Sequence, residues 1–192
     1  MLGKTTGQEN PTSNFEYEFV LVDEKYTKNA WCMPGGKIAF YSGILPILKN
    51  KDGIATVMGH EIAHAVARHS AERASTAYVT NLGVRALEQL VLKQKIPQQI
   101  EYVRKFGLDL PYNRKQESEA DYLGLIFMSL AGYNVNESYK VWERMKNDKS
   151  IDMRISNLIP EFLKTHPSHD NRSKKLKEWI PLVNAKYPAI ST

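Results

Sequence analysis

The sequence contains a single cysteine, Cys32, among its 192 residues. One thiol excludes an internal disulfide, and it also excludes a zinc module built from several cysteines. We interpret Cys32 as a small buried side chain in a strand rather than as a reactive thiol. Any metal site in this chain must therefore draw its ligands from histidines and carboxylates.

Long apolar segments are also missing. The longest apolar run covers residues 122–133, whereas about 20 apolar residues are needed to span a bilayer. This run predicts a buried core helix. Residues 1–14 are polar and lack the apolar core of a signal peptide, so we expect a flexible lead-in there. Residues 15–192 are expected to form a single domain.

Charge of one sign is not strongly in excess, since 26 Lys and Arg against 21 Asp and Glu leave a net charge of +5. No basic stretch is interleaved with aromatic residues that stack on bases, so no nucleic-acid partner is expected. A mildly basic surface is compatible with contact with an anionic membrane or an acidic protein.

The order of elements predicts an α+β fold that is mainly helical, with a small β-sheet near the N-terminus. Polar–aromatic alternation predicts a strand over residues 15–22, and two more strands are expected over 30–33 and 37–41. The Pro34-Gly35-Gly36 turn favours a hairpin or close pair for the last two.

Helical patterns follow the sheet. Asp52 is the expected N-cap of the first long helix, and Gly132 is the expected C-cap of a later one. Two segments are expected to be irregular, 97–115 and 150–170. Residues 74–115 separate the two helices that carry the candidate ligands. They form either a lid or a membrane- or partner-facing insert, or they simply pack against the rest of the domain. Helices are expected over 42–50, from 53 to at least 69, and over 74–96, 114–130, 136–145 and 168–183.

The feature that carries chemistry is His60-Glu61-Ile62-Ala63-His64, set in an apolar run. Residues four apart on a helix are offset by about 40° and rise by about 6 Å, so His60 and His64 can both reach one metal ion. Glu61 is offset by about 100° from His60, so it is placed to hold a water rather than to ligate. This pattern is typical of zinc peptidases.

Two histidines cannot complete a zinc site, so a further ligand is required. A histidine six residues after His64 would indicate the metzincin arrangement, but Ser70 stands there. A carboxylate from a second helix is the other solution. Glu117 and Asp121 are four apart and share a helical face. One can ligate the metal while the other hydrogen-bonds a ligand imidazole.

Three blocks of this sequence together resemble a family of zinc metallopeptidases. That family includes the CAAX prenyl endopeptidase, the heat-shock protease HtpX, the mitochondrial overlapping-activity protease and BepA. The resemblance covers about residues 25–180 and is greatest to the soluble, periplasmic branch, which implies a gluzincin fold. The blocks are Val57-x-Gly59-His60-Glu61-x-x-His64, then Glu117-x-Glu119-Ala120-Asp121, and His166-Pro167 followed by Arg172.

The resemblance implies roles for the residues of the first two blocks. His60, His64 and Glu117 would be the ligands of one Zn²⁺ per chain. Glu61 would be the general base that activates a zinc-bound water, and Asp121 would hold a ligand imidazole in place. His69 lies about 140° round the helix from His64 and so off the metal face; we interpret it as a structural or surface residue.

The resemblance also implies a catalytic role for His166, either as a fourth ligand in a resting form or as a stabiliser of the oxyanion. His169 is interpreted as a helix-start residue. If residues 37–41 form an exposed edge strand, they can bind an extended peptide by strand addition; alternatively they are simply the edge of a small sheet. The residues expected to contact substrate are Gly35, Gly36, Lys37, Ile38, Ala39 and Arg172.

The expected function is hydrolysis of peptide bonds in unfolded or membrane-associated proteins, in quality control of the cell envelope. The alternative is a latent or weakly proteolytic chaperone or assembly factor that retains the zinc site. By the same resemblance, the expected location is the bacterial periplasm, in contact with a membrane.

Overall fold

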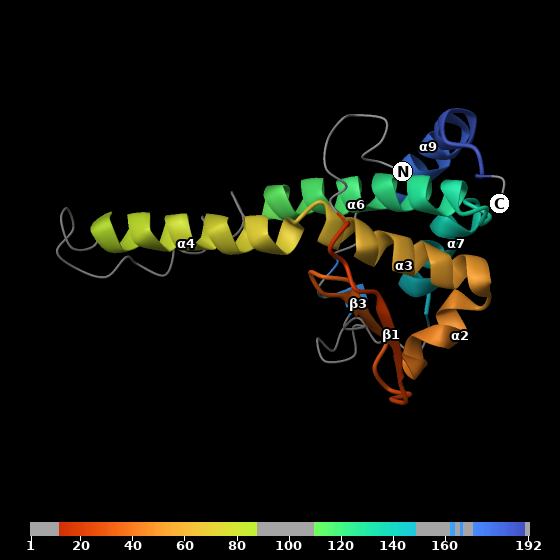
Figure 1. Ribbon diagram of the computed structural model, residues 1–192, viewed down its shortest axis with the longest axis horizontal. Coiled ribbons are helices and arrows are strands. Elements are labelled where there is room, and N and C mark those ends of the chain that lie inside the picture. The colour runs from red at the N-terminus through yellow and green to blue at the C-terminus, as the bar shows by residue number, and fades with distance from the viewer. Residues whose placement is uncertain (1–11, 88–109, 149–161, 164–165, 167–170, 191–192) are drawn as a thin grey trace.

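The computed structural model describes residues 12–87, 110–148, 162–163, 166 and 171–190. It is α+β and mainly helical, as predicted, with a small sheet beside a body of helices (Figure 1). One helix, α4, extends well beyond that body. Among the described residues, no helix combines the length and the apolar character needed to cross a membrane.

The sheet has three strands, β1 (Glu18–Val22), β2 (Ala30–Cys32) and β3 (Lys37–Tyr41). Their order is β1-β3-β2, with β1 parallel and β2 antiparallel to β3. The predicted pairing of the second and third strands is confirmed. The turn between them uses Gly35 and Gly36, whose φ values of 96° and 94° favour glycine.

The prediction that residues 37–41 form an exposed edge strand is wrong. β3 is the central strand, because β1 and β2 occupy its two sides. Ile38 and Ala39 are only 2% and 1% exposed. The continuous apolar run Ile38-Ala39-Phe40 is typical of a strand that is buried on both faces.

The helices follow in the predicted order. Residues 42–48 form a 3₁₀ turn, η1, that runs into the short helix α2. The bounds of the described helices are η1 Ser42–Ile44, α2 Leu45–Leu48, α3 Lys51–Val66, α4 His69–Leu87, α6 Leu110–Leu130, α7 Glu137–Lys146 and α9 Arg172–Lys186.

Two predictions about the first long helix are wrong. Its N-cap is Asn50, whose side chain accepts a hydrogen bond from the Gly53 N–H at 2.9 Å. Asp52 instead accepts from the backbone N–H of Asn134 at 3.1 Å, which ties the helix start to another loop. The helix does not reach residue 69, because Arg68 has a left-handed φ of 58° and a new helix starts after it.

The later helices differ from expectation mainly at their ends. α6 begins at Leu110 rather than near residue 114, and α9 runs over Arg172–Lys186 rather than 168–183. Gly132 follows α6 with a φ of 75°, as expected for a C-cap. The expectations for residues 1–11, 88–109 and most of 150–170 lie outside the described residues.

α3 and α6 lie side by side and form the centre of the helical body (Figure 1). The two helices approach closely at Gly59 and Gly124. A Cβ atom on Gly59 would lie 3.1 Å from the carbonyl oxygen of Gly124. The hydrophobic core around this pair includes Ile38, Ile44, Leu48, Leu125, Met145, Phe162 and Leu176, all buried.

Candidate metal centre

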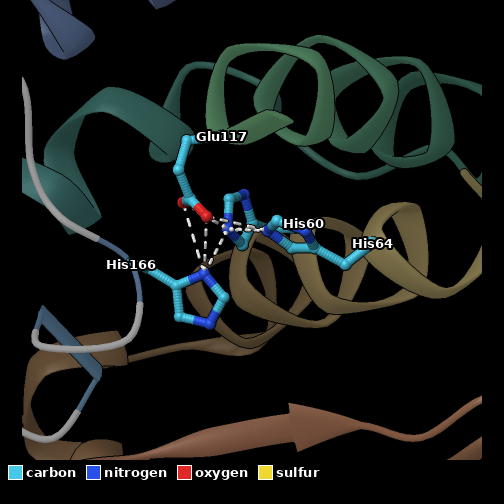
Figure 2. Close-up of side chains that lie close together, drawn as sticks. All are labelled: His60, His64, Glu117 and His166. Atoms are coloured by element: carbon cyan, nitrogen blue, oxygen red, sulfur yellow. Dashed lines mark hydrogen bonds and ion pairs between the residues drawn. The ribbon is translucent and has the colours of Figure 1, made fainter. Parts of the chain in front are cut away.

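Helix α3 places His60 and His64 on one face, one turn apart, as the motif predicts. Both side chains are buried, and their Nε2 atoms are 3.1 Å apart. Glu117 reaches the same point from α6. Its Oε2 is 3.3 Å from His60 Nε2 and its Oε1 is 3.2 Å from His64 Nε2. The three predicted ligands are therefore brought together (Figure 2).

His166 joins this group from the chain before α9. Its Nδ1 atom is 3.3 Å from His60 Nε2 and 3.1 Å from Glu117 Oε1. Figure 2 shows the four side chains pointing toward one another. All four are buried, and each offers one ligand atom within 4.8 Å of every other.

The spacing of these atoms fits a four-coordinate metal ion. Bonds of about 2.0–2.1 Å in a tetrahedron separate the ligand atoms by about 3.3–3.4 Å. Nε2 of His60 lies 3.1–3.3 Å from Nε2 of His64, Nδ1 of His166 and Oε2 of Glu117. The other oxygen of Glu117, Oε1, lies 3.1–3.2 Å from the same atoms of His64 and His166. Three imidazoles and one carboxylate are also ligand types that zinc prefers.

Glu61 lies beside the ligand cluster and is 4% exposed. Its Oε1 atom is 3.2 Å from His166 Nε2. Among the described residues, this oxygen has no hydrogen-bond partner of good geometry. The backbone N–H of Cys32 hydrogen-bonds to the carboxylate. Burial raises the pKa of Glu61, and the nearby His166 and His60 oppose this in part. A buried carboxylate with a free acceptor oxygen is suited to hold and deprotonate a water molecule.

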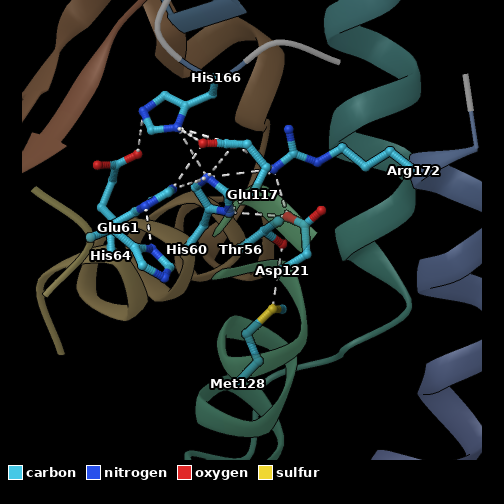
Figure 3. A network of polar contacts seen from close by, with 10 residues as sticks. Thr56, His60, Glu61, His64, Glu117, Asp121, Met128, His166 and Arg172 are labelled. Carbon is cyan, nitrogen blue, oxygen red and sulfur yellow. Dashed lines mark hydrogen bonds and ion pairs between the residues drawn. The ribbon is translucent and has the colours of Figure 1, made fainter. Parts of the chain in front are cut away.

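Asp121 contacts His60 on the side opposite the cluster (Figure 3). Its Oδ1 is 3.0 Å from His60 Nδ1 and accepts a hydrogen bond from Arg172 Nη2 at 2.6 Å. Burial alone would raise the pKa of Asp121, but Arg172 and His60 hold it below its usual value. The carboxylate therefore stays charged and keeps the Nδ1 hydrogen of His60 directed toward itself.

Arg172 is a buried side chain that lies next to Asp121 and His60. It is 4% exposed, and its guanidinium lies 3.4 Å from the centre of the Trp142 ring. Its Nη2 also comes within 3.6 Å of Glu117 Oε2. The contacts of Arg172 thus include Asp121, Glu117, Trp142 and, at 3.2 Å, Nδ1 of His60. Its contact with substrate stays a prediction.

The two histidines of α3 have opposite protonation preferences. Burial would lower the pKa of His60, but hydrogen bonds to Asp121 and Glu117 raise it to about 9. Burial lowers the pKa of His64 to about 3, despite its contact with Glu117. Burial would raise the pKa of Glu117, but the surrounding imidazoles hold it far below its usual value.

His69 has a position that the sequence interpretation missed. It is 1% exposed, and its Nδ1 lies 2.8 Å from Nδ1 of His64. The interpretation assumed one continuous helix, on which His69 would point away from the metal face. The break at Arg68 removes that geometry. Arginine carries no sequence signal for a left-handed residue, so the break was not predictable.

Of the predicted substrate residues, Gly35 and Gly36 lie in the turn from β2 into β3, whereas Ile38 and Ala39 are buried within β3. A Cβ on Gly36 would contact Tyr17 at 3.2 Å and Phe15 at 3.3 Å, so this glycine packs against the segment before β1. A Cβ on Gly35 would meet nothing within 4 Å. Their role, like that of Lys37, stays a prediction. His169 lies outside the described residues.

Two histidines on one helix and a carboxylate on a second helix define the H-E-x-x-H class of metal centre with a gluzincin ligand set. The chain belongs to peptidase family M48, whose family model matches residues 6–180.

Relatives with assigned names are similar over most of this chain. The mitochondrial metalloendopeptidase OMA1 of Saccharomyces cerevisiae is 39% identical in an alignment of 177 residues that covers 88% of this chain and 48% of the yeast protein. OMA1 of Schizosaccharomyces pombe is 39% identical over 91% of this chain and 50% of its own length. The beta-barrel assembly-enhancing protease of Escherichia coli is 27% identical over 81% of this chain and 33% of its own. The chain thus spans about half the length of the fungal relatives.

Proposed function

We propose that this chain is a zinc-dependent metalloendopeptidase that hydrolyses peptide bonds. The observation that carries the proposal is the buried set of donor atoms from His60, His64 and Glu117 with the Glu61 carboxylate beside it. These three residues would hold the zinc ion, which when bound acidifies water and polarises a carbonyl group. The names of the M48 relatives support the same reaction.

Glu61 performs the proton transfers in this proposal. It takes a proton from the attacking water and returns it to the nitrogen of the leaving amine. Burial raises the pKa of its carboxyl group toward the range in which one group can both accept and donate a proton near neutral pH. The Cys32 N–H holds the carboxylate in place while it does so.

The substrate backbone, in this proposal, pairs with β2 rather than with β3. The backbone N–H of Met33 points toward β3 and donates to the carbonyl oxygen of Lys37 at 2.8 Å. Because successive N–H groups of a strand point in opposite directions, the N–H of Cys32 points away from β3. The Cys32 N–H accordingly reaches Glu61. The outer edge of β2 therefore borders the general base, and an extended peptide added there would have its backbone beside the site.

The test compares wild type with Glu61→Gln on an unfolded protein. We expect cleavage to fall by about 10²–10⁴-fold, because the amide cannot take the proton. Zinc content and melting temperature serve as controls and are expected to stay unchanged, since Glu61 is not a ligand. Equal cleavage by the two proteins would refute the peptidase assignment.

A second candidate is a latent form of the enzyme, which acts as a chaperone or assembly factor while His166 fills the ligand set. It is favoured by His166 Nδ1, 3.1 Å from Glu117 Oε1 and 3.3 Å from His60 Nε2. If His166 blocks the place that water needs, His166→Ala raises cleavage, and the gain disappears in the double variant with Glu61→Gln. A large loss of cleavage with zinc retained would instead assign His166 to oxyanion stabilisation.

We further propose a role in protein quality control at a membrane, with unfolded or membrane-associated proteins as substrates. The name of the Escherichia coli relative, a beta-barrel assembly-enhancing protease, supports this. The fungal relatives are named mitochondrial and are more similar than the Escherichia coli protein. The bacterial periplasm predicted from the sequence therefore gains no support over the mitochondrion.

A further inference from the structure

His64 faces the candidate metal centre with Nε2 and a second imidazole with Nδ1. The Nδ1 atoms of His64 and His69 are 2.8 Å apart, which is hydrogen-bonding distance. Both side chains are buried, with exposed fractions of 4% and 1%. Water is thus largely excluded as an alternative partner for the Nδ1 atom of His64.

The directions of the hydrogens follow from the position of the cluster. If Nε2 of His64 gives its lone pair to a metal, the ring hydrogen must sit on Nδ1. Nδ1 of His69 must then accept that hydrogen, which leaves the hydrogen of His69 on its Nε2. That atom lies 3.5 Å from Oε2 of Glu119, a carboxylate that can accept it. Every hydrogen along this chain has one donor and one acceptor.

The arrangement parallels the support of the other histidine on α3. There, Nδ1 of His60 contacts Asp121, which is in turn held by Arg172. In each case a buried side chain, Asp121 or His69, contacts Nδ1 of a candidate ligand imidazole. A further charged side chain, Arg172 or Glu119, contacts that buried side chain in turn. His69 is the first residue of α4, and Glu119 lies on α6. The contacts therefore link three helices around one ligand.

We infer that His69 is a positioning residue that fixes the tautomer and orientation of His64 for metal binding, with Glu119 as the final acceptor. The inference rests on the proposed zinc site, but not on the occurrence of peptide hydrolysis. Groups that orient metal ligands in this way typically contribute about 10–100-fold to metal affinity. Because Glu119 is half exposed, with 54% of its side chain accessible, its contribution is the smaller one.

Two substitutions with the same branching at Cγ separate hydrogen bonding from packing. His69→Leu puts a methyl group where Nδ1 was, whereas His69→Asn puts a carbonyl oxygen there that can accept the His64 hydrogen. Zinc affinity is measured by competition with a chromophoric chelator, and the visible spectrum of the cobalt-substituted protein reports ligand geometry. Val141→Ala, a core substitution on α7 at a fully buried residue, controls for general loss of stability.

We expect His69→Leu to weaken zinc binding by about 10–100-fold and to alter the cobalt spectrum. His69→Asn and Val141→Ala are expected to stay within about 3-fold of wild type. Wild-type affinity in His69→Leu would overturn the inference, and so would an equal loss in the Leu and Asn variants. Failure of wild type to bind zinc would overturn it as well. If only His69→Leu binds zinc more weakly while Glu61→Gln cleaves like wild type, the inference about His69 stands and the proposed peptidase function fails.

Discussion

At the scale of single residues, His60 and His64 differ in charge although they lie one turn apart. His60 contacts both Asp121 and Glu117, and these carboxylates raise its pKa to about 9. His64 is buried beside the protonated His60, and its pKa falls to about 3. In the metal-free cluster, His60 is therefore charged at neutral pH and His64 is not.

Zinc binding at pH 7 is predicted to displace the proton that His60 holds. His60 has a raised pKa, so it stays protonated until the pH rises through about 9, and a metal must displace that proton. Affinity should therefore rise by up to about 10-fold per pH unit between pH 7 and 9, and level off above. Calorimetric titration in buffers with different ionisation heats measures the proton count. Binding heats that do not depend on the buffer would contradict the assigned charge.

The ligand residues were largely predictable from sequence because helix geometry fixes residues four apart. That geometry placed His60 and His64 on one face and paired Glu117 with Asp121. The resemblance then chose Glu117 as the ligand. His69 was not predictable, because its contact depends on a change of helix direction at Arg68, where the backbone adopts a left-handed φ of 58°. A left-handed φ is uncommon at residues other than glycine, and arginine has no preference for it that would predict the break.

At the scale of elements, the crossing of α3 and α6 sets the distance between ligands. Gly59 directly precedes His60, and a Cβ on Gly124 would lie 3.1 Å from the backbone nitrogen of His60. Two glycines let the helix backbones approach to a separation that side chains would prevent. Glu117 lies on the same helix as Gly124, about two turns away, so the crossing controls how far its carboxylate reaches.

Gly124→Ala is predicted to weaken zinc binding as well as stability. The added Cβ would lie 3.1 Å from the backbone of His60, so α6 and α3 must separate by a few tenths of an ångström. Overpacking typically costs about 1–3 kcal/mol of unfolding free energy. The same shift moves Glu117 away from the two histidines. Chemical denaturation of the metal-free protein and chelator competition measure the two effects separately.

Gly53→Ala is the matched control for that substitution. Its Cβ would lie 2.0 Å from the carbonyl oxygen of Leu48, so it should also destabilise the fold. It stands at the start of α3, about two turns from His60, and should leave zinc affinity nearly unchanged. Equal losses of affinity in both variants would show that stability alone, rather than helix separation, controls the site.

The sheet shows where prediction from sequence ends. The strands over 30–32 and 37–41 and their pairing followed from composition and a Pro-Gly-Gly turn. Strand order did not, because β1 inserts beside β3 through a parallel pairing that no local signal encodes. The apolar run in β3 is consistent with its central position. β2 is therefore an edge strand, and it is the strand that lies next to Glu61.

At the scale of the whole molecule, the metal centre joins distant parts of the chain. His60 and His166 are 106 residues apart in sequence, and Glu117 and His166 are 49 apart. A ligand shared by these segments closes large loops, and a preformed site of this kind does not exist in an unfolded chain. The metal therefore binds only the folded state and stabilises it by mass action.

Removal of the metal is predicted to lower the melting temperature. Zinc at 100 times its dissociation constant adds about 2.7 kcal/mol to the unfolding free energy. For a domain of this size that corresponds to about 5–10 °C. Calorimetry of the zinc-loaded and chelator-treated protein measures the shift, and Glu117→Gln, which lacks one ligand, should show a smaller one. Identical melting of both wild-type forms would mean that the four side chains do not share a metal, because an ion that binds the folded state alone must raise its stability.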